Sequence, residues 1–262
     1  MTRYVFVSGC PRSGTTGMAK ILGWAPKTFI GQERFNLRFN RNQADLVPAL
    51  FEPARLRRFE KFDCGYDSYD GQPAYASGDA NPEMIAGIDT ATVFGDKLIS
   101  LWQDFSVFDA PAWQGQTVDI VHIVRDPGAV AASYQTRFND HNDLWQADFE
   151  NGIGVWTRSV KRVSRWLGQD QARSATRMHV VRYENLFDVP EAEFIDRCRT
   201  LFSALGLDFL AVQEQGMKRI HAVGQHRKET RQNHPEVAAR LEALLQPGVL
   251  HRHDDLVARS IV

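Results

Sequence analysis

Short apolar runs with strand-forming residues recur along the chain, and segments with helical periodicity separate them. Five such runs, each rich in β-branched or aromatic residues, span 4–7, 28–31, 93–99, 118–124 and 178–186. Runs of this length and composition are typical of buried strands. Strands that alternate with helices pair in parallel, because each helix carries the chain back across a face of the sheet. The pattern therefore predicts an α/β fold with a central, mainly parallel β-sheet flanked by helices.

Further helices are expected where apolar residues return at a spacing of three and four. They span 44–62, 149–167, 190–205 and 235–245, and the last is the final helix expected. In the first of them the charged run Arg55–Lys61 is expected to form a solvated face. Two segments lack the helical spacing. The segment 65–80, with its Tyr, Asp and Gly residues, is expected to be a loop that either covers a substrate or lies on the surface, and 220–228 is basic and turn-like.

The composition limits the kinds of partner. The chain has 262 residues, of which 43% are hydrophobic and 24% charged, and one domain over 1–262 is the simplest organisation. The net charge is −1, so no overall basic field favours nucleic acid as a partner. An anionic ligand would have to be held by local cations instead.

The cysteine, histidine and apolar patterns favour a cytoplasmic protein without a metal. Three cysteines, an odd number without metal-ligand spacing, indicate reduced thiols, and the histidines also lack such spacing. Cys10 lies in a tight turn, where a small filling residue is favoured over a reactive thiol. The first strand starts at once, with no secretory leader before it, and no apolar run has the length of a membrane span.

The first strand leads into a turn bounded by Gly9 and Gly14, after which a helix opens. A strand, a glycine-bounded loop and a helix N-terminus form an anion cradle, because backbone N–H groups and the helix dipole point at the same place. The spacing of the glycines is that of a nucleotide P-loop, which predicts a three-layer P-loop-type fold. Here, however, Thr15 occupies the position of the usual lysine, and the cation is Arg12. The residues expected to bind the phosphate-like group are Pro11, Arg12, Ser13, Gly14, Thr15 and Thr16.

A second candidate anion site follows the strand at 118–124. Arg125 ends this strand, and Asp126 is expected to cap the next helix. Ser133 lies eight residues after Arg125, and Arg137 follows one helical turn later, so Ser133 and Arg137 share a helix face and could bind one anion. The alternative is an Arg125 that only forms a salt bridge.

Two charged residues stand at the ends of other strands. Glu33 follows the strand at 28–31, at the sheet edge where α/β proteins keep their active sites, but the local sequence favours a surface residue paired with Arg34 or Arg38. Lys97 lies in an otherwise apolar run, where a lysine needs a partner. Asp96 is one possible partner and a ligand is the other.

At this point the residues resemble a known family. Cys10–Thr16 is similar to the 5′-phosphosulfate loop of sulfotransferases that use 3′-phosphoadenosine 5′-phosphosulfate (PAPS). Ile123–Pro127, with Ser133 eight residues after the arginine, resembles their 3′-phosphate motif. The two motifs occur in the family's order, each after a strand. The arginine in the loop makes the chain most similar to the tyrosylprotein and Golgi-type branch and its bacterial relatives.

The resemblance implies roles for several residues. The tyrosylprotein enzymes have a strand-end Gly-x-Glu whose glutamate is the base, and Glu33 stands at the same offset from the loop arginine. Lys97 is similar to the family lysine that reaches the transferring sulfuryl group, and Arg137 resembles a second 3′-phosphate arginine. Tyr183 begins a segment that looks like the family's Tyr-Glu-x-Leu near the nucleotide. The implied reaction is in-line transfer from PAPS to a hydroxyl or amine, without a metal.

The chain also departs from the family. It lacks the Lys-Thr-His segment of the cytosolic small-molecule enzymes and their Arg-Lys-Gly phosphate motif, for which Gln225 and Arg227 are the candidate replacements. The acceptor therefore does not carry over, and it could be a small molecule, a carbohydrate, a lipid or a peptide. The variable segment 36–90 is expected to shape the acceptor side.

Two other functions stay open on the sequence. A P-loop kinase would use Asp126 as a magnesium ligand, although its loop lysine is missing. A protein that binds PAP, the product of PAPS, could also keep the fold without catalysing transfer. The sequence does not indicate the oligomeric state.

Overall fold

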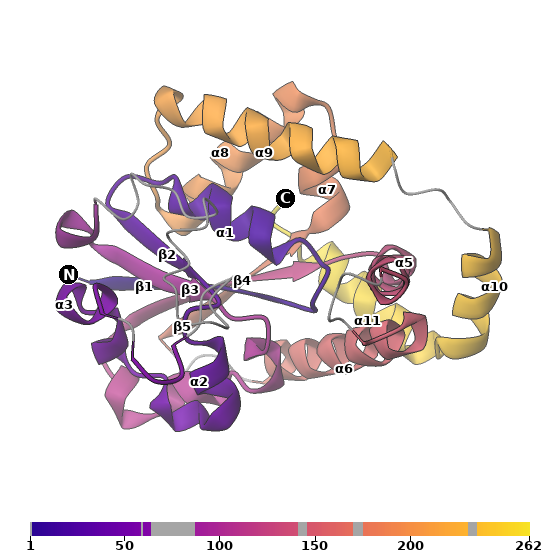
Figure 1. The fold of residues 1–262 in the computed structure, drawn as a ribbon, viewed down its shortest axis with the longest axis horizontal. Helices are drawn as coiled ribbons and strands as arrows, with labels where there is room; N and C mark the ends of the chain where they lie inside the picture. The colour runs from indigo at the N-terminus through magenta and orange to yellow at the C-terminus, as the bar shows by residue number, and fades with distance from the viewer. Residues whose placement is uncertain (1, 59, 64–86, 141–145, 170–174, 230–234) are drawn as a thin grey trace.

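The computed structural model describes residues 2–58, 60–63, 87–140, 146–169, 175–229 and 235–262. Its centre is a five-stranded sheet with the order β2-β3-β1-β4-β5, in which every pairing is parallel (Figure 1). The strands are β1 (Arg3–Gly9), β2 (Thr28–Gln32), β3 (Val93–Lys97), β4 (Thr117–Val124) and β5 (Thr176–Arg182). Each strand coincides with one of the five apolar runs. The expected α/β fold with a parallel sheet is therefore confirmed.

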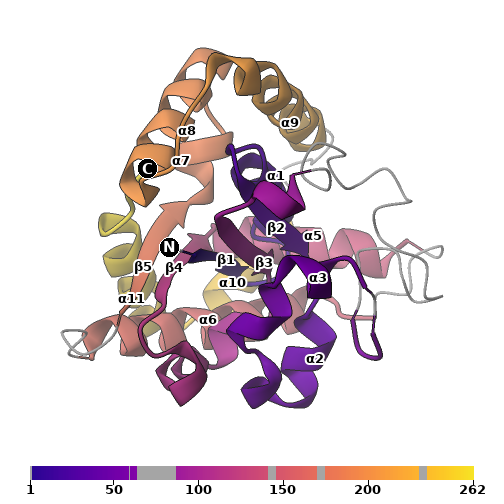
Figure 2. The same ribbon diagram turned by 90° about the vertical axis from the view of Figure 1, so that its left-hand side faces the viewer.

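Helices cover both faces of this sheet, as Figures 1 and 2 show. Among the described residues the α-helices are α1 (Thr15–Gly23), α2 (Asn36–Arg41), α3 (Pro53–Leu56), α5 (Pro127–Phe138), α6 (Phe149–Gly168), α7 (Tyr183–Phe187), α8 (Glu191–Leu205), α9 (Ala211–Glu229), α10 (Pro235–Leu244) and α11 (Pro247–Ala258). Short 3-10 helices are η1 (Gln43–Asp45), η2 (Pro48–Phe51), η5 (Ile88–Thr90), η6 (Leu101–Gln103), η7 (Ser106–Asp109) and η8 (Pro111–Trp113). None of the helices described is both long and apolar enough to cross a membrane.

Alternation along the central strand divides the core into two apolar layers. Val5 and Val7 of β1 belong to the cluster that contains Met18 of α1, whereas Phe6 belongs to the cluster that contains Trp156 of α6. This division follows from the geometry of a strand, in which successive side chains point to opposite faces. The helices α1, α7, α8 and α9 lie on one face, and α6 and α11 lie on the other (Figure 1).

The strand register brings the candidate residues to one edge of the sheet. Lys97 of β3 lies opposite Val7 of β1 and Gln32 of β2, so Glu33 follows its strand beside Lys97. Gly9 lies opposite Ile123 of β4. Because all strands are parallel, the loops after β1, β2, β3 and β4 leave the sheet at the same edge.

The single helix expected over 44–62 is wrong. The segment forms η1, η2 and α3 instead, separated by extended residues. Pro48 and Pro53 explain the breaks, since each stands at the start of a new short helix. Proline lacks a backbone N–H and disfavours the helical conformation of the residue before it, so it starts helices but does not continue them.

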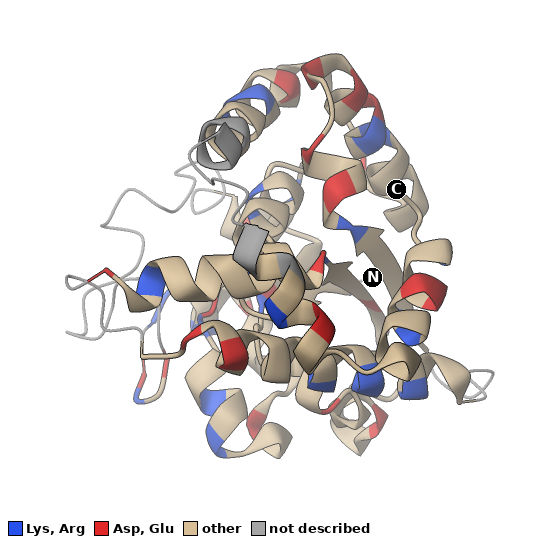
Figure 3. Ribbon diagram, turned by 90° about the vertical axis from the view of Figure 1, so that its right-hand side faces the viewer, with Lys and Arg blue, Asp and Glu red and all other residues tan. Residues whose placement is uncertain are grey.

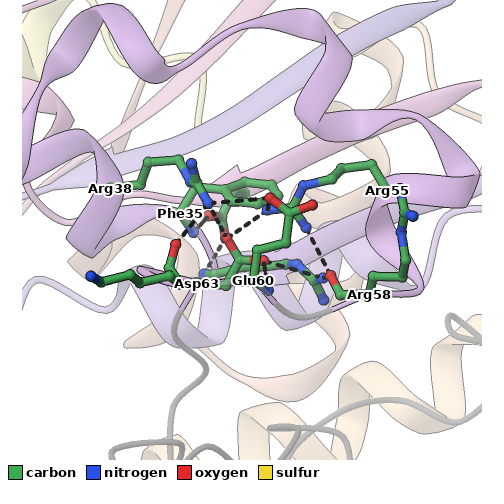
Figure 4. A network of polar contacts seen from close by, with 9 residues as sticks. Phe35, Arg38, Arg55, Arg58, Glu60 and Asp63 are labelled. Carbon is green, nitrogen blue, oxygen red and sulfur yellow. Dashed lines mark hydrogen bonds and ion pairs between the residues drawn. The ribbon is translucent and has the colours of Figure 1, made fainter.

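The charged run Arg55–Lys61 is solvated only in part, since Arg57, Arg58, Glu60 and Lys61 are exposed whereas Arg55 is not. Arg55 is buried, and its Nη2 lies 2.7 Å from Oδ1 of Asp63, whose side chain is fully buried. Arg38 and Arg34 approach the same carboxylate at 3.1 and 3.7 Å, and Figure 4 shows Arg38 and Arg55 converging on it. A buried carboxylate is stable only when cations and hydrogen bonds compensate it, and here several arginines do so.

The C-terminal part differs from expectation in two places. The segment 220–228, expected to be turn-like, lies within α9, which packs against α8 and α1. The helix expected over 235–245 is confirmed as α10, but α11 follows it and begins at Pro247. In addition, the strand expected to reach 186 ends at Arg182, and α7 starts at the next residue. The loop expected over 65–80 lies outside the described residues.

Candidate anion-binding and transfer site

The loop between β1 and α1 has the backbone of an anion cradle. Arg12 and Gly14 have positive φ angles of 73° and 99°, and the N–H of Ser13 donates to the carbonyl of Cys10 at 3.0 Å. Residues in this conformation turn successive N–H groups toward one point. The first turn of α1, which starts at Thr15, carries no acidic residue, so no side chain of that turn offsets the positive end of the helix dipole.

Glycine is required at one position of this loop. A Cβ on Gly14 would lie 2.5 Å from the ring of Tyr183, and its φ of 99° disfavours any side chain. The ring of Tyr183 in turn stacks on Phe187 of α7, with centroids 4.8 Å apart. The segment after β5 therefore packs directly on the loop.

Two buried polar atoms at the loop lack a partner among the residues that the structure describes. One is the hydroxyl oxygen of Ser13, a residue that is 1% exposed, and the other is Nε of Arg125, a residue that is 7% exposed. A buried polar group without a hydrogen bond is costly, which makes such atoms pointers to a ligand. Both are donors, and an oxyanion would satisfy them.

The two motifs expected to bind anions meet in space. Nε of Arg12 donates to Oγ of Ser133 at 2.9 Å, and Nη1 of Arg125 donates to the carbonyl of Arg12, also at 2.9 Å. The guanidinium of Arg125 lies 3.8 Å from the centroid of the Tyr183 ring. No carboxylate of the described chain forms an ion pair with Arg125, so the alternative of a simple salt bridge finds no support there. Arg137 is half-buried, one turn after Ser133 on α5.

Glu33 and Lys97 form an ion pair beside this loop. Nζ of Lys97 lies 2.7 Å from Oε1 of Glu33 and donates to Oγ1 of Thr16 at 3.0 Å. The Lys97 side chain is 1% exposed and that of Glu33 is 24% exposed, so the carboxylate is accessible while the ammonium is not. The pair thus connects the end of β2, the end of β3 and the start of α1.

The sequence did not suggest that these two residues pair with each other. The carboxylate of Asp96 accepts the backbone N–H groups of Arg34 and Phe35, at 3.2 and 2.7 Å. Neighbours on a strand point to opposite faces, so these hydrogen bonds lie on the other side of β3 from the Glu33–Lys97 pair. Burial raises the pKa of Asp96 to about 7, against the lowering effect of its two backbone hydrogen bonds and of the nearby charge of Lys97. Glu33 in turn pairs with Lys97, whereas Arg34 bonds to Asp63.

The other residues that the sequence singled out lie in the loop after β1 or on α9. Thr15 is buried and Pro11 is partly exposed, both in the loop. Cys10 is buried, and burial raises the pKa of its thiol, so it fills the turn as a protonated residue. Gln225 and Arg227 lie on α9, but their side chains lie outside what the structure describes.

Several supporting residues were missed by sequence reasoning. The carboxylate of Glu184 accepts the backbone N–H of Asp126 at 2.9 Å, and Nε1 of Trp156 donates to the carbonyl of Arg125 at 2.9 Å. These bonds hold the end of β4. Asp126 caps α5 as expected, accepting the N–H of Ala129 at 2.8 Å. Glu184 lies inside the Tyr-Glu-x-Leu resemblance, which was the only signal available for it.

A cavity of about 600 Å³ adjoins the loop and was also missed. Pro11, Ser100 and Tyr134 line it, together with residues of α6. The sequence predicted α6 from its apolar face alone, whereas the cavity is lined by the opposite, basic face. Within the part of the chain that is described, no group of three or more His, Cys, Asp and Glu residues could hold a metal ion.

The fold is α/β with a parallel sheet, and the loop after β1, which contains Arg12, has the backbone conformation of an anion cradle. Residues 117–211 match the sequence profile of the sulfotransferase family. This stretch includes Arg125, Ser133, Arg137 and Tyr183, but not the loop after β1. Over residues 117–211 the chain therefore matches the sulfotransferase family expected from the motifs, while the tyrosylprotein and Golgi-type branch stays a prediction. No curated protein matches the chain.

Solved sulfotransferase structures are similar over nearly the whole chain. The sulfotransferase from Alicyclobacillus acidocaldarius is 15% identical, with a TM-score of 0.56 over 99% of this chain and 97% of that one. The sulfotransferase domain of the Synechococcus PCC 7002 olefin synthase is 18% identical, with a TM-score of 0.53 over 98% and 95%. The sulfotransferase domain of the curacin biosynthetic pathway is 12% identical, with a TM-score of 0.51 over 99% of both chains. At such identities the likeness establishes the fold alone.

Proposed function

We propose that this protein transfers a sulfuryl group from PAPS to the hydroxyl or amine of an acceptor. The observation that supports this most is the convergence of the two anion motifs, through the bonds of Arg12 to Ser133 and of Arg125 to the Arg12 carbonyl. PAPS carries phosphate at both its 5′ and 3′ ends, which matches two neighbouring groups of cations and hydroxyls. The buried Ser13 hydroxyl and Arg125 Nε are donors that such a ligand would satisfy.

The residues that would hold the donor follow from this arrangement. The loop Pro11–Thr16 would bind the 5′-phosphosulfate end through its N–H groups and Arg12. Arg125, Ser133 and Arg137 would bind the 3′-phosphate, and Tyr183 would contact the nucleotide. Gln225 and Arg227 are retained as candidates for completing the 3′-phosphate and adenine site. When bound, PAPS would supply the sulfuryl group and leave as PAP.

Glu33 would act as the general base. Its carboxylate is accessible and would take the proton from the acceptor hydroxyl as the oxygen attacks sulfur. Lys97, which is buried and bonded to both Glu33 and Thr16, would orient this carboxylate and present positive charge toward the leaving phosphate. Arg12 and the N–H groups at the start of α1 would add to this charge stabilisation. Positioning and electrostatics would thus supply most of the catalysis.

Calorimetric titration with PAP and, separately, with ATP and magnesium tests the proposal. We expect PAP to bind much more tightly than ATP, because ATP lacks the 3′-phosphate that Arg125 and Ser133 would recognise. Tight binding would then be followed by transfer of radiolabelled sulfate from PAPS to an acceptor. A preference for ATP would contradict the proposal and favour the kinase, and PAP binding without transfer to any acceptor would favour a non-catalytic PAP-binding protein.

A further inference from the structure

The cavity beside the anion loop has one strongly basic wall. Four of its lining residues are the α6 cations Arg158, Lys161, Arg162 and Arg165. Their spacing of three and four residues places them on one face of the helix. The opposite face of α6 is buried in the core through Trp156 and other apolar residues. The basic face is therefore turned toward the cavity.

These four cations lack acidic partners within the described part of the chain. No hydrogen bond or ion pair links Arg158, Lys161, Arg162 or Arg165 to a carboxylate there. Arginines on other helices behave differently. For example, Arg199 of α8 pairs with both Asp196 and Glu214, and Arg240 of α10 pairs with Glu150 at 3.8 Å.

Unpaired like charges at this spacing are unfavourable. Two cations one helical turn apart destabilise a helix by about 0.2–0.5 kcal/mol per pair, and α6 carries several such pairs. An acidic side chain at a neighbouring position would offset this cost. Asp104 lines an adjoining cavity of about 140 Å³ together with Arg162 and Arg165, but its carboxylate accepts hydrogen bonds from Ser106. An anionic ligand in the main cavity would offset the repulsion.

The cavity also lies next to the groups proposed to act in transfer. Pro11, which lines it, adjoins Arg12, and Ser100 lies three residues after Lys97. The backbone N–H of Ser100 donates to Oδ1 of Asn36 at 3.3 Å, which connects the cavity wall to the segment that begins at Glu33. A ligand in this cavity would therefore reach the transfer site from the α6 side of the sheet, opposite α1.

We infer that this cavity binds the acceptor, and that the acceptor is a small hydroxyl compound carrying a phosphate or carboxylate group. The four α6 cations would bind the anionic group and direct the hydroxyl toward Glu33. A volume of about 600 Å³ suits a small molecule. The identity of the reaction rests on the proposed function, whereas the anion selectivity of the cavity rests on α6 alone.

The test uses a pair of fluorescent probes that differ in charge, 2-naphthol-6,8-disulfonate and 2-naphthol. Binding to the full-length protein is followed by fluorescence, with and without saturating PAP. We expect the disulfonate to bind and 2-naphthol to bind far more weakly. The variant Arg158→Gln/Arg162→Gln should lower the affinity for the disulfonate by about tenfold or more, because it removes two charge-assisted contacts. The affinity for 2-naphthol should stay unchanged. Inorganic phosphate and acetate are then compared as competitors of the disulfonate. Stronger competition by phosphate would indicate an acceptor that carries a phosphate, and stronger competition by acetate one that carries a carboxylate.

The matched control is Arg199→Gln/Arg240→Gln, which makes the same change in net charge away from the cavity. It should alter the affinity for the disulfonate by less than about twofold, because distant exposed charges are screened. Equal losses in both variants, equal binding of both probes, or no binding of the disulfonate would overturn the inference. PAP affinity is measured in parallel. If the disulfonate binds as expected but PAP does not, the proposed function is contradicted, whereas the inference that the cavity selects anions still holds.

Discussion

At the scale of single residues, the Glu33–Lys97 pair is the feature on which the proposed chemistry depends most. A carboxylate that is 24% exposed is held at 2.7 Å by an ammonium that is almost fully buried. The buried member fixes the position of the accessible one, and the accessible one compensates the buried charge. Such an arrangement suits a base that must be held in one orientation until an acceptor arrives.

Replacement of Glu33 tests this role. Glu33→Gln keeps the size of the side chain and a hydrogen-bond acceptor for Lys97 but removes the proton acceptor. We expect turnover to fall by about 10²–10⁴-fold, with PAP affinity nearly unchanged. Radiolabelled sulfate transfer and calorimetry measure the two quantities, and Glu242→Gln, an exposed change on α10, is the control. Full activity in Glu33→Gln would exclude Glu33 as the base.

Arg125 offers a second test at the same scale. Arg125→Ala removes the guanidinium that lies over Tyr183 and would bind the 3′-phosphate. PAP should bind about 10–100-fold more weakly, since a hydrogen bond to a charged group contributes about 1.5–3 kcal/mol. The affinity for adenosine 5′-phosphosulfate, which lacks the 3′-phosphate, should fall much less. If calorimetry shows equal losses for the two ligands, Arg125 does not recognise the 3′-phosphate but only supports the Arg12 carbonyl.

The limits of sequence reasoning are also clearest for individual residues. Spacing and the family resemblance together selected Arg12, Ser133 and Arg125, and the structure brings all three together. The partner of Lys97 was not predictable, because it depends on the register in which Gln32 lies opposite Lys97. Nor does periodicity within one segment identify residues that meet across a cavity.

At the scale of secondary-structure elements, the strands and helices marked by apolar runs or capping residues were predicted better than the segments between them. All five strands follow from the runs, and α8 ends at Gly206, whose φ of 59° makes it a left-handed cap. The segment 44–62 failed because Pro48 and Pro53 override helical periodicity. The helix α9 was missed in part because its basic end has no apolar stripe, although it packs on α8 and α1 through earlier turns.

The backbone of Gly14, at the junction of β1 and α1, leads to a prediction about stability. Gly14→Ala should lower the free energy of unfolding by about 1–3 kcal/mol, since it combines a positive φ with a contact of 2.5 Å to Tyr183. Gly224→Ala is the matched control, because no atom lies within 4 Å of its added Cβ and it lies inside α9. That change should be neutral or stabilise by up to about 1 kcal/mol. Denaturant unfolding measures both, and equal effects would show that the loop geometry does not constrain Gly14.

At the scale of the whole molecule, charge is mixed on the outside and locally concentrated at the site. The net charge is −1, and Figure 3 shows Lys and Arg interspersed with Asp and Glu along the outer helices α8 and α9. The composition indicates that an anionic ligand would have to be bound by local cations, but it does not show where these cations lie. That one domain spans 1–262 and that the protein is cytoplasmic stay predictions.

A buried histidine inside the sheet, His122, links the stability of the fold to pH. His122 of β4 is buried, with Nδ1 3.2 Å from Oγ of Ser8 on the neighbouring strand. Burial lowers the pKa of His122 to about 3, from an ordinary value of 6.5. Between these two values the unfolded chain binds a proton that the folded chain does not. His122 therefore costs no stability above pH 6.5, and stability falls as the pH falls through the window below it.

This linkage predicts the behaviour of a His122→Gln variant. At about pH 5, protonation of His122 in the unfolded chain should remove about 2 kcal/mol of stability from the wild type. The variant keeps a polar side chain near Ser8 but has no proton to bind. Its free energy of unfolding should therefore fall by about 2 kcal/mol less than that of the wild type between about pH 7.5 and pH 5. Urea unfolding at both pH values measures the difference, and parallel losses in the two proteins would show that other groups account for the acid sensitivity.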